Sequence, residues 1–585
     1  MAPRYTQAVT AALRGRPNLT PSGGAVINPA MLTTIALATM LVLALGYLFY
    51  GRFIADQYRI DDKRRTPAVV FEDGVDYVPT PRFYLLGQHF SAIAAAGPIA
   101  GPILACSQFG WLPCLLWIGI GVIFIGAVHD FSSLIASVRH NGNSVAEIVR
   151  GTLGQRAWLA IMIFIWIALI YVIIAFADIT ASTFVSGGED LAGTEFQFNA
   201  GGAVAAASVM YLLLALVMGV VTKWWNPPLW LITVVFVPAT LLAVWAGTQV
   251  STWLILSSRV WALLILAYCL VASLIPVWLL LQPRGYLGGF ILYLALFVGV
   301  VGVCFGNYEI KQEAFKGWST AGPTGSLWPF LFVTIACGAC SGFHGLVCSG
   351  TTSKQIARES DCRPIGYGAM LLEGFVALIA LATVMIVSNS ELAGKAPGTI
   401  YGQGLGQFLT LLIGREHLAF ATTFGAMAFS TFVFDTLDVS TRLGRYIVQE
   451  LLGWRTTAGA IAATLATIVP PAISILVADE GSYRLFWTLF GTSNQLLAGL
   501  TLLSITVWLR RGGRRYWYTL IPMMFVMTIT LWSLVLQAKA ALTAVAETGA
   551  FGATAVNGVV SLMLMGLALF LVFEAVKILR RPLPA

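Results

Sequence analysis

The sequence predicts an all-α protein that crosses a membrane many times. Of its 585 residues, 58% are hydrophobic and only 10% are charged, and the mean hydropathy is +0.83. The apolar residues form runs of about 20, the length of a helix that spans the hydrocarbon core of a bilayer. No soluble fold hides that much apolar surface from water. The composition therefore indicates that the protein lies in a lipid bilayer, which is its first expected partner.

Taking each long apolar run as one span gives about fifteen transmembrane helices. Their expected limits are 30–53, 85–107, 111–137, 157–185, 201–221, 229–248, 259–281, 286–304, 327–348, 364–389, 417–436, 457–477, 484–508, 516–537 and 556–579.

The basic residues predict the orientation of the chain. When loops alternate between the two sides, 24 of the 34 lysines and arginines fall on one side, which should be cytoplasmic. The N-terminus is then expected outside and the C-terminus inside. Because the net charge of +8 comes from short loops of this kind, nucleic acid is not an expected partner. The cytoplasmic loops that carry most of the excess are 54–84, 138–156, 349–363, 437–456 and 509–515.

Several other classes of protein are excluded by missing motifs. The HExxH, GxSxG and P-loop patterns do not occur, so we expect no enzyme, no catalytic residue, no cofactor and no direct use of ATP. Cys337, Cys340, His344 and Cys348 would share one helix face and so suggest a metal site. That face spreads its ligands over about 16 Å, too far for one ion, so no metal is expected.

One predicted span cannot be an ordinary helix. The stretch IACGACSGFHGLVCSGTTSK, Ile335–Lys354, holds four glycines, a histidine and several hydroxyl side chains within an apolar run. Glycine costs about 1 kcal/mol relative to alanine in a helix interior. The pattern predicts a helix that breaks inside the membrane, which is tolerated only where protein or a watery cavity shields the backbone.

A second interrupted span lies near the start of the chain. In HFSAIAAAGPIAGPILACSQFG, His89–Gly110, the pairs Gly97-Pro98 and Gly101-Pro102 place two helix breakers four residues apart. Each proline lacks a backbone donor and clashes with the preceding turn of a helix. This span is therefore also expected to break.

The two broken spans are the second and the ninth, an odd number of spans apart. Five-span units starting at each would enter the membrane from opposite faces, as inverted repeats of transporters do. The expected organisation is an N-terminal segment with one extra span (1–84), a first repeat (85–248), two extra spans (249–326), a second repeat (327–508) and two C-terminal spans (509–585).

Long stretches of the sequence carry a resemblance to a known family. They are GQHFSAIAAAGPIAGPILA, GAVHDFSSLIASVRHNGNSVAEI and CGACSGFHGLVCSGTTSKQIARESDCRPIGYGAMLLEG, supported by STFVFDTLDVSTRLGRY. They resemble the carbon starvation protein family of bacterial inner-membrane transporters, whose members take up peptides and pyruvate. The resemblance covers about residues 30 to 510 and implies the amino acid–polyamine–organocation superfamily, hence a LeuT-like core of two inverted five-helix repeats. Cys340 and Cys348 stand where small residues are expected.

A break exposes backbone N–H groups at one helix end and carbonyl groups at the other. The N–H groups suit a carboxylate, so the two breaks are expected to enclose a small anionic substrate. Close helix packing through small residues is the alternative reading of the glycines. Asn494 belongs to a polar cluster that either lines the pathway or bonds neighbouring helices. The expected substrate-binding residues are Ala96, Gly97, Pro98, Gly101, Ser341, Gly342, His344, Gly345 and Asn494.

Ionisable groups at membrane depth are costly and indicate function. Buried carboxylates can carry a proton, and a histidine can titrate near neutral pH. Structural alternatives are a salt-bridged helix end for His129 and Asp130, a cap paired with Arg442 or Arg445 for Asp435, and a histidine bonded to backbone for His344. Asp178 and Asp438 also fall at membrane depth. The residues expected to couple protons are His129, Asp130, Glu373 and Asp435.

Together these features predict a secondary active transporter that works by alternating access. The expected cargo is a small carboxylate such as pyruvate, or an amino acid or short peptide, coupled to a proton gradient. Ser430 and Thr431 supply hydroxyl oxygens where a LeuT-like fold binds sodium, so a sodium-coupled symporter is the alternative. A channel is a further alternative, which counterflow of labelled substrate would exclude.

Overall fold

The computed structural model describes residues 30–74, 76–185, 198–322, 324–478, 482–549 and 552–581. In these ranges the chain is helical, and its only strand-like pairings are two isolated bridges, Thr80 with Ile356 and Ser319 with Ser326. Residues 1–29, which include the N-terminus expected outside, fall beyond the described chain.

The helices of the first half follow in chain order. They are α2 (Ala30–Leu45), η1 (Gly46–Tyr50), α3 (Gly51–Tyr58), α4 (Pro67–Val70), α5 (Arg82–Ile93), α6 (Gly97–Phe109), α7 (Trp111–Gly121), η2 (Val122–Gly126), α8 (Ala127–Arg139), α9 (Val145–Leu153), α10 (Gln155–Val185), α11 (Ala200–Trp225), α12 (Leu229–Gln249), α13 (Ser258–Leu274) and α14 (Leu281–Phe305).

The helices of the second half complete the fold. They are α15 (Leu327–Thr334), α16 (Gly342–Gly350), η3 (Thr352–Lys354), η4 (Glu359–Asp361), η5 (Arg363–Gly368), α17 (Ala369–Met385), α18 (Asn389–Leu392), α19 (Pro397–Ile413), η6 (Arg415–His417), α20 (Leu418–Leu452), α21 (Thr457–Val477), α22 (Tyr483–Arg511), α23 (Trp517–Thr548) and α24 (Ala553–Leu579).

The described chain has 11 helices long and apolar enough to cross a membrane, or 12 when the bent pair α5 and α6 counts as one span. The protein is therefore a multi-pass membrane protein. Three further expected spans coincide with helices that are short, interrupted or polar in the middle: α13, the pair α15 and α16, and α22. The count of about fifteen stays a prediction.

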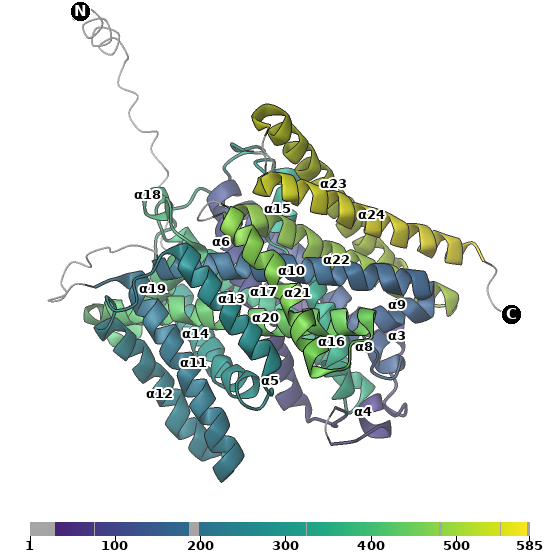
Figure 1. Cartoon of the computed structure of the whole chain (residues 1–585), viewed down its shortest axis with the longest axis horizontal. Coiled ribbons are helices and arrows are strands. Elements are labelled where there is room, and N and C mark those ends of the chain that lie inside the picture. Colours follow the sequence, from purple (N-terminus) through teal and green to yellow (C-terminus); the bar gives the residue numbers. More distant parts are fainter. Residues whose placement is uncertain are drawn as a thin grey trace, which may run out of the picture.

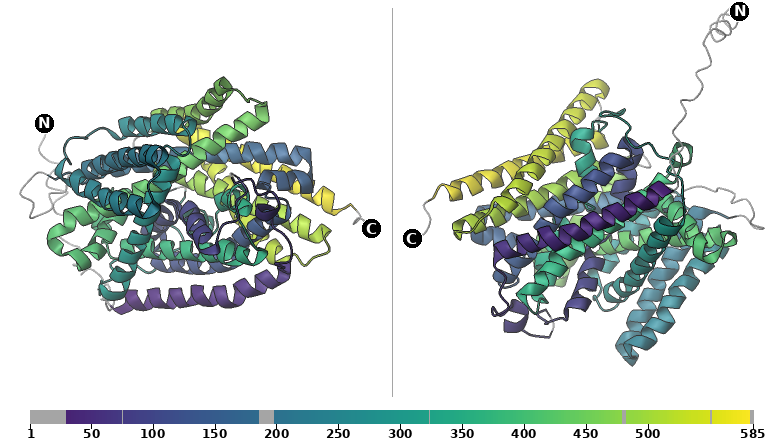
Figure 2. Two further views of the ribbon diagram at one scale, coloured as in Figure 1. Left: turned by 90° about the horizontal axis from the view of Figure 1, so that it is seen from below. Right: turned by 180° about the vertical axis from the view of Figure 1, so that it is seen from behind.

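The helices form a central group with others around it. Helix α10 and the span Glu359–Met385 are the most enclosed of the candidate spans in the described chain, each with 83% of its most apolar window buried, whereas only 22% of the corresponding window of the first span is buried. Figure 1 shows α10 and α22 crossing the middle, with α11 and α12 on one side and α23 and α24 on the opposite side. The first span, purple in Figure 2, runs along the edge of the molecule.

Helix α19 was not expected. Its 17 residues contain four glycines and two glutamines, so its sequence does not read as an apolar run. Its glycines allow close packing on α20: a Cβ added at Gly402 would meet Ala426 at 2.7 Å, and one at Gly406 would meet Thr422 at 2.8 Å. Spacing of small residues by four is the usual way in which membrane helices approach each other closely.

The first broken span bends by 45° between α5 and α6. The break occupies residues 94–96, just before Gly97 and not at the two Gly-Pro pairs themselves. Pro98 explains this position, because it has no N–H to bond the carbonyl of Ala94 and its ring clashes with that turn. Pro102 lies inside α6.

The second broken span separates more completely, as the sequence predicts. Helix α15 ends at Thr334 and α16 begins at Gly342, so residues 335–341 lie outside both helices. This segment coincides with the start of the glycine-rich stretch, and it holds Cys337, Gly338 and Cys340.

Candidate functional site

The carbonyl groups released by the second break are bonded by side chains of other helices. Trp487 donates its indole N–H to Thr334 O at 3.1 Å, and Trp117 donates to Ile335 O at 3.1 Å. The amide of Gln495 donates to Phe332 O at 3.0 Å. Because lipid offers no donors, these bonds are what allow the backbone to leave the helix at this depth.

Asn494 binds the opposite side of the same break. Its Oδ1 accepts the N–H of Phe343, in the first turn of α16, at 2.9 Å, and the hydroxyl of Ser341 at 3.3 Å. Its Nδ2 lies 3.1 Å from Ser341 Oγ and 3.2 Å from Cys337 Sγ. Of the two roles left open for this residue, the structure shows bonding to a neighbouring helix.

The two breaks face each other. A Cβ added at Gly97 would overlap the side chain of Cys337, and one at Gly101 would lie 2.7 Å from Thr334 O. From the other side, a Cβ at Gly338 would lie 3.4 Å from Pro98 Cα. The glycines therefore bring the start of α6 into direct contact with the unwound segment 335–341.

Four ionisable residues meet directly beside this contact. His344, in the first turn of α16, places Nδ1 2.8 Å from Asp130 Oδ2 and Nε2 3.1 Å from Glu373 Oε2. Asp130 Oδ1 in turn lies 2.8 Å from His129 Nδ1. The imidazole of His344 is thus clamped between two carboxylates that come from α8 and α17. We call His129, Asp130, His344 and Glu373 the acid–histidine cluster.

The acid–histidine cluster is closed to solvent, because none of its four side chains is more than 1% exposed. Its hydrogen bonding is incomplete: His129 Nε2 and Glu373 Oε1 have no hydrogen-bond partner within the described residues, and Glu373 Oε2 has only its 3.1 Å ion-pair contact with His344 Nε2. Among those residues no group of three His, Cys, Asp or Glu side chains suits a metal ion. Unpaired buried polar atoms are costly, and such groups mark sites that act on protons or ligands.

The remaining predicted substrate-binding residues lie around this cluster. A Cβ added at Gly345 would lie 3.2 Å from the ring of His129. One at Gly342 would overlap the backbone of α22 at Asn494. Ala96, Ser341 and Gly342 are buried with them. The sequence-predicted set therefore gathers at one place, with the exceptions described next.

Asp435 lies elsewhere. It forms an ion pair with Arg284 of α14, not with Arg442 or Arg445, and its side chain is 24% exposed. Arg284 is fully buried and also pairs with Asp438 at 2.9 Å. The sequence interpretation missed Arg284, because it assigned this residue to the short loop between the seventh and eighth spans.

The hydroxyls considered for sodium are also separate. Ser430 Oγ lies 2.8 Å from Ser208 Oγ and donates to Met427 O. Thr431 Oγ1 is buried without a hydrogen-bond partner among the described residues. These two residues therefore offer one free oxygen between them.

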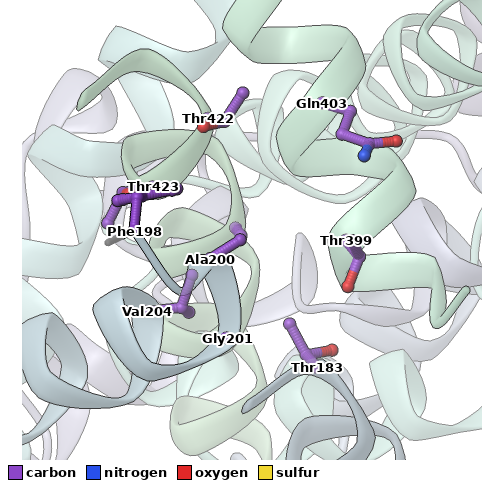
Figure 3. Close-up of a pocket in the computed structure, with 10 residues that line it drawn as sticks. Thr183, Phe198, Ala200, Gly201, Val204, Thr399, Gln403, Thr422 and Thr423 are labelled. Atoms are coloured by element: carbon purple, nitrogen blue, oxygen red, sulfur yellow. The ribbon is translucent and has the colours of Figure 1, made fainter. Parts of the chain in front are cut away.

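A small cavity of about 50 Å³ lies between α10, α11, α19 and α20. Figure 3 shows Thr183, Thr399 and Gln403 on one side of it and Phe198, Val204, Thr422 and Thr423 on the other. None of its lining residues belongs to the acid–histidine cluster or to either break. We assign no role to it. Asp178 lines another small cavity with Arg259 and Phe486.

Other members of the site escaped the sequence interpretation. The sequence pattern gives His89, at the mouth of the first broken span, the role of a gate or cap and not of a ligand; its Nδ1 lies 2.8 Å from Thr352 Oγ1, just past the end of α16. Trp117 and Trp487 were not identified as partners of the break, whereas Gln495 belongs to the same polar cluster as Asn494, for which bonding to neighbouring helices was one of two expectations. A tryptophan or glutamine within an apolar run is the available signal, since each carries a donor that needs a partner when buried.

Comparison with known proteins identifies the family. The model of the carbon starvation protein CstA family matches residues 31–404 and 386–533. The peptide transporter CstA of Bacillus subtilis is 33% identical over 602 residues, covering 93% of this chain and 96% of its own. That of Mycobacterium tuberculosis is 32% identical, covering 86% and 75%. The pyruvate/proton symporter BtsT of Escherichia coli is 32% identical, covering 86% and 81%.

Among solved structures, a manganese transporter of Eremococcus coleocola aligns with a TM-score of 0.44 at 13% identity, covering 86% of this chain and 98% of its own. MhsT in complex with L-phenylalanine aligns at 0.39 and 13% identity, covering 84% and 98%. Neither likeness is close enough to support an argument about the fold. The family match and the sequence relatives are sufficient by themselves: this chain belongs to the carbon starvation protein CstA family.

Proposed function

We propose that the protein is a secondary active transporter of the bacterial inner membrane that moves a small carboxylate such as pyruvate, or an amino acid or short peptide, together with a proton. The relatives named as peptide transporters and as a pyruvate/proton symporter support this cargo class. The observation that carries the proposal is the position of His344, clamped between Asp130 and Glu373 at the second break.

The charges of the acid–histidine cluster explain why proton and substrate would move together. Two carboxylates and two imidazoles change their net charge with every proton they bind, and they do so where water is excluded. An uncompensated charge is costly in such a place. A proton on Glu373 or His344 would offset the negative charge that a carboxylate substrate brings to the neighbouring break.

The helix ends at the two breaks indicate where the substrate carboxylate would bind. Helix α16 presents its first turn to the contact between the two breaks, and α6 begins there with Gly97 and Pro98. The N-terminal end of a helix attracts an anion through its free N–H groups and its dipole. Because the two breaks are in tight contact, α6 and the segment 335–341 have to separate to admit the substrate.

The larger architecture is part of the same proposal. We propose that 85–248 and 327–508 are inverted repeats of a LeuT-like core, each starting with its broken span, and that the C-terminus is cytoplasmic. The breaks in α5–α6 and α15–α16 support this arrangement. Alternating access would then move one set of helices against the other around the site.

Transport by the purified protein in liposomes tests the proposal. Uptake of labelled pyruvate, amino acids and dipeptides is measured while the pH gradient and the sodium gradient are varied separately. We expect accumulation of one substrate class that follows the pH gradient. If accumulation follows the sodium gradient alone, the coupling ion is sodium and not a proton. The unpaired Thr431 oxygen is then a candidate sodium ligand. Failure of counterflow between labelled and unlabelled substrate would indicate a channel and reject the carrier.

A further inference from the structure

A cavity lies apart from the acid–histidine cluster, where four loops and helix ends meet. Its volume is about 480 Å³, and it is lined by residues of the 54–84 segment, the end of α8, the segment before η5 and the loop after α22. All four segments belong to the side on which basic residues are concentrated in the sequence. From its charges and contacts we propose that this cavity binds a phosphate group.

The cavity is strongly positive. Arg64, Arg65, Arg139 and Arg514 line it, and Glu359 is the one acidic residue among the described residues that line it. Glu359 is already fully engaged: it pairs with Arg139 at 2.9 Å and with Arg64 at 3.3 Å, and it accepts the backbone N–H of Asp61 at 3.0 Å. It therefore cannot neutralise the other two arginines.

Arg139 supplies an independent sign of a missing acceptor. Its side chain is only 10% exposed, and its Nη2 donates to Glu359 and to the carbonyl of Tyr58. Its Nη1 is buried and has no hydrogen-bond partner within the described residues. A buried guanidinium that leaves a donor unused is costly, and an oxyanion in the cavity would remove that cost once a small shift of the Arg139 side chain brings Nη1 to the cavity wall.

Arg514 shows the same excess of positive charge. Burial, together with the nearby Arg139 and Arg64, lowers the pKa of Arg514 from its usual range. Its Nη1 donates to the carbonyl of Tyr58 at 3.3 Å. Arg514 lines the cavity and forms no ion pair with an acid among the described residues. An anion bound between Arg514 and Arg139 would relieve their mutual repulsion.

Several arginines around one cavity favour phosphate over a single carboxylate, because each planar guanidinium can bond two oxygens of a multivalent oxyanion. The phosphate can belong to a lipid headgroup or to a soluble compound. Val70 and Phe71 line the same cavity and are 49% and 45% exposed, which would suit the acyl side of a lipid. The preference of basic loops for the cytoplasmic side of a membrane explains why many basic residues lie on one side of the protein. It does not explain why four arginines line one cavity together with one acid.

The test uses the full-length protein in two arms. In detergent, inorganic phosphate is titrated at constant ionic strength against chloride, and the thermal unfolding midpoint is followed. In nanodiscs, phosphatidylcholine alone is compared with phosphatidylcholine containing phosphatidylglycerol. The variant Arg65→Gln with Arg514→Gln removes two arginines that do not pair with Glu359. Arg455→Gln, at an exposed arginine outside the cavity, is the matched control.

We expect stabilisation of the wild-type protein and of Arg455→Gln, and at least a tenfold loss of phosphate affinity, or loss of the phosphatidylglycerol effect, in the double variant. A response to phosphate alone assigns the site to soluble compounds, and a response to phosphatidylglycerol alone assigns it to lipid. If the double variant does not fold, Arg65→Gln alone should still weaken the response severalfold. No stabilisation in either arm, or equal stabilisation of the variants, overturns the proposal.

Discussion

Replacing Asn494 by leucine tests how the second break is held. Leucine is close in size to asparagine, but it removes the acceptor of the Phe343 N–H at 2.9 Å and the bonds to Ser341 and Cys337. Asn494 is only 4% exposed, so water does not replace these bonds in the folded state. Leaving a buried N–H unpaired costs about 1–3 kcal/mol, and each lost side-chain bond adds about 1 kcal/mol.

We therefore expect the free energy that opens the first turn of α16 to fall by about 3 kcal/mol. The full sum is not reached because Ser341 can recover part of its hydrogen bonding. Each ~1.4 kcal/mol is a factor of ten in an equilibrium, so amide hydrogen exchange at residues 343–346 should accelerate about a hundredfold. Mass spectrometry of exchanged peptides covering 341–350 measures this. Transport should fall with it.

Two variants serve as controls for this measurement. Asn494→Asp keeps an acceptor for the Phe343 N–H and, with its buried carboxyl in the neutral protonated form, should leave exchange much closer to the wild-type rate than Asn494→Leu does. Asn557→Leu removes a buried asparagine of α24 whose side-chain oxygen accepts the hydroxyl of Tyr171, in α10, at 2.8 Å. This variant should leave the exchange rate of the 341–350 peptide unchanged. Wild-type exchange of that peptide in Asn494→Leu would refute the reasoning.

Three further predictions concern coupling and the first break. Glu373→Gln should abolish the accumulation of substrate that a pH gradient drives, while sparing the exchange of labelled for unlabelled substrate. In the wild-type protein, one proton carried with each substrate anion would accumulate the substrate about tenfold per pH unit. Pro98→Ala together with Pro102→Ala should restore the helical bonding across residues 94–96 and stop transport, as measured by uptake into liposomes. Gly101→Ala places a Cβ 2.7 Å from a backbone carbonyl of α15 and should destabilise the protein by about 1–3 kcal/mol in chemical unfolding.

Each of these has a comparison variant. Asp435→Asn tests whether the carboxylate paired with Arg284 carries the proton instead, and unchanged accumulation in both carboxylate variants would exclude both residues. Wild-type uptake by the double proline variant would show that the break does not depend on the prolines. A Cβ added at Gly119 meets nothing within 4 Å, so Gly119→Ala should keep wild-type stability; a loss equal to that of Gly101→Ala would contradict the packing argument.

Residue chemistry predicted the broken spans well. Glycines and hydroxyl side chains in an apolar run marked the second break, and the structure places it at 335–341. The first break occupies the three residues directly before the first Gly-Pro pair, and not the pairs themselves, because Pro98 disrupts the turn that precedes it. Local rules of backbone geometry were sufficient in both places.

The pairing between residues that are distant in the chain could not be predicted from the sequence. His129, Asp130, His344 and Glu373 were each identified as costly groups at membrane depth, but their meeting depends on how α8, α16 and α17 pack. Arg284 was missed for the same reason. A loop arginine and a buried one look alike in sequence, and only its two aspartate partners distinguish them.

The helix α19 was missed because hydropathy detects contact with lipid, whereas this helix is built for contact with protein. Glycines and glutamines lower its apolar content, and the same glycines allow α20 to approach it closely. A search for small residues spaced by four would have found it.

The burial of the acid–histidine cluster has a consequence for leakage under the proposed function. Glu373 is 0% and His344 1% exposed, so a proton can reach either side chain only when the helices packed around them move apart. If protons are coupled as proposed, a resting copy of the protein would therefore hold its proton sites closed and leak little of the gradient that drives it.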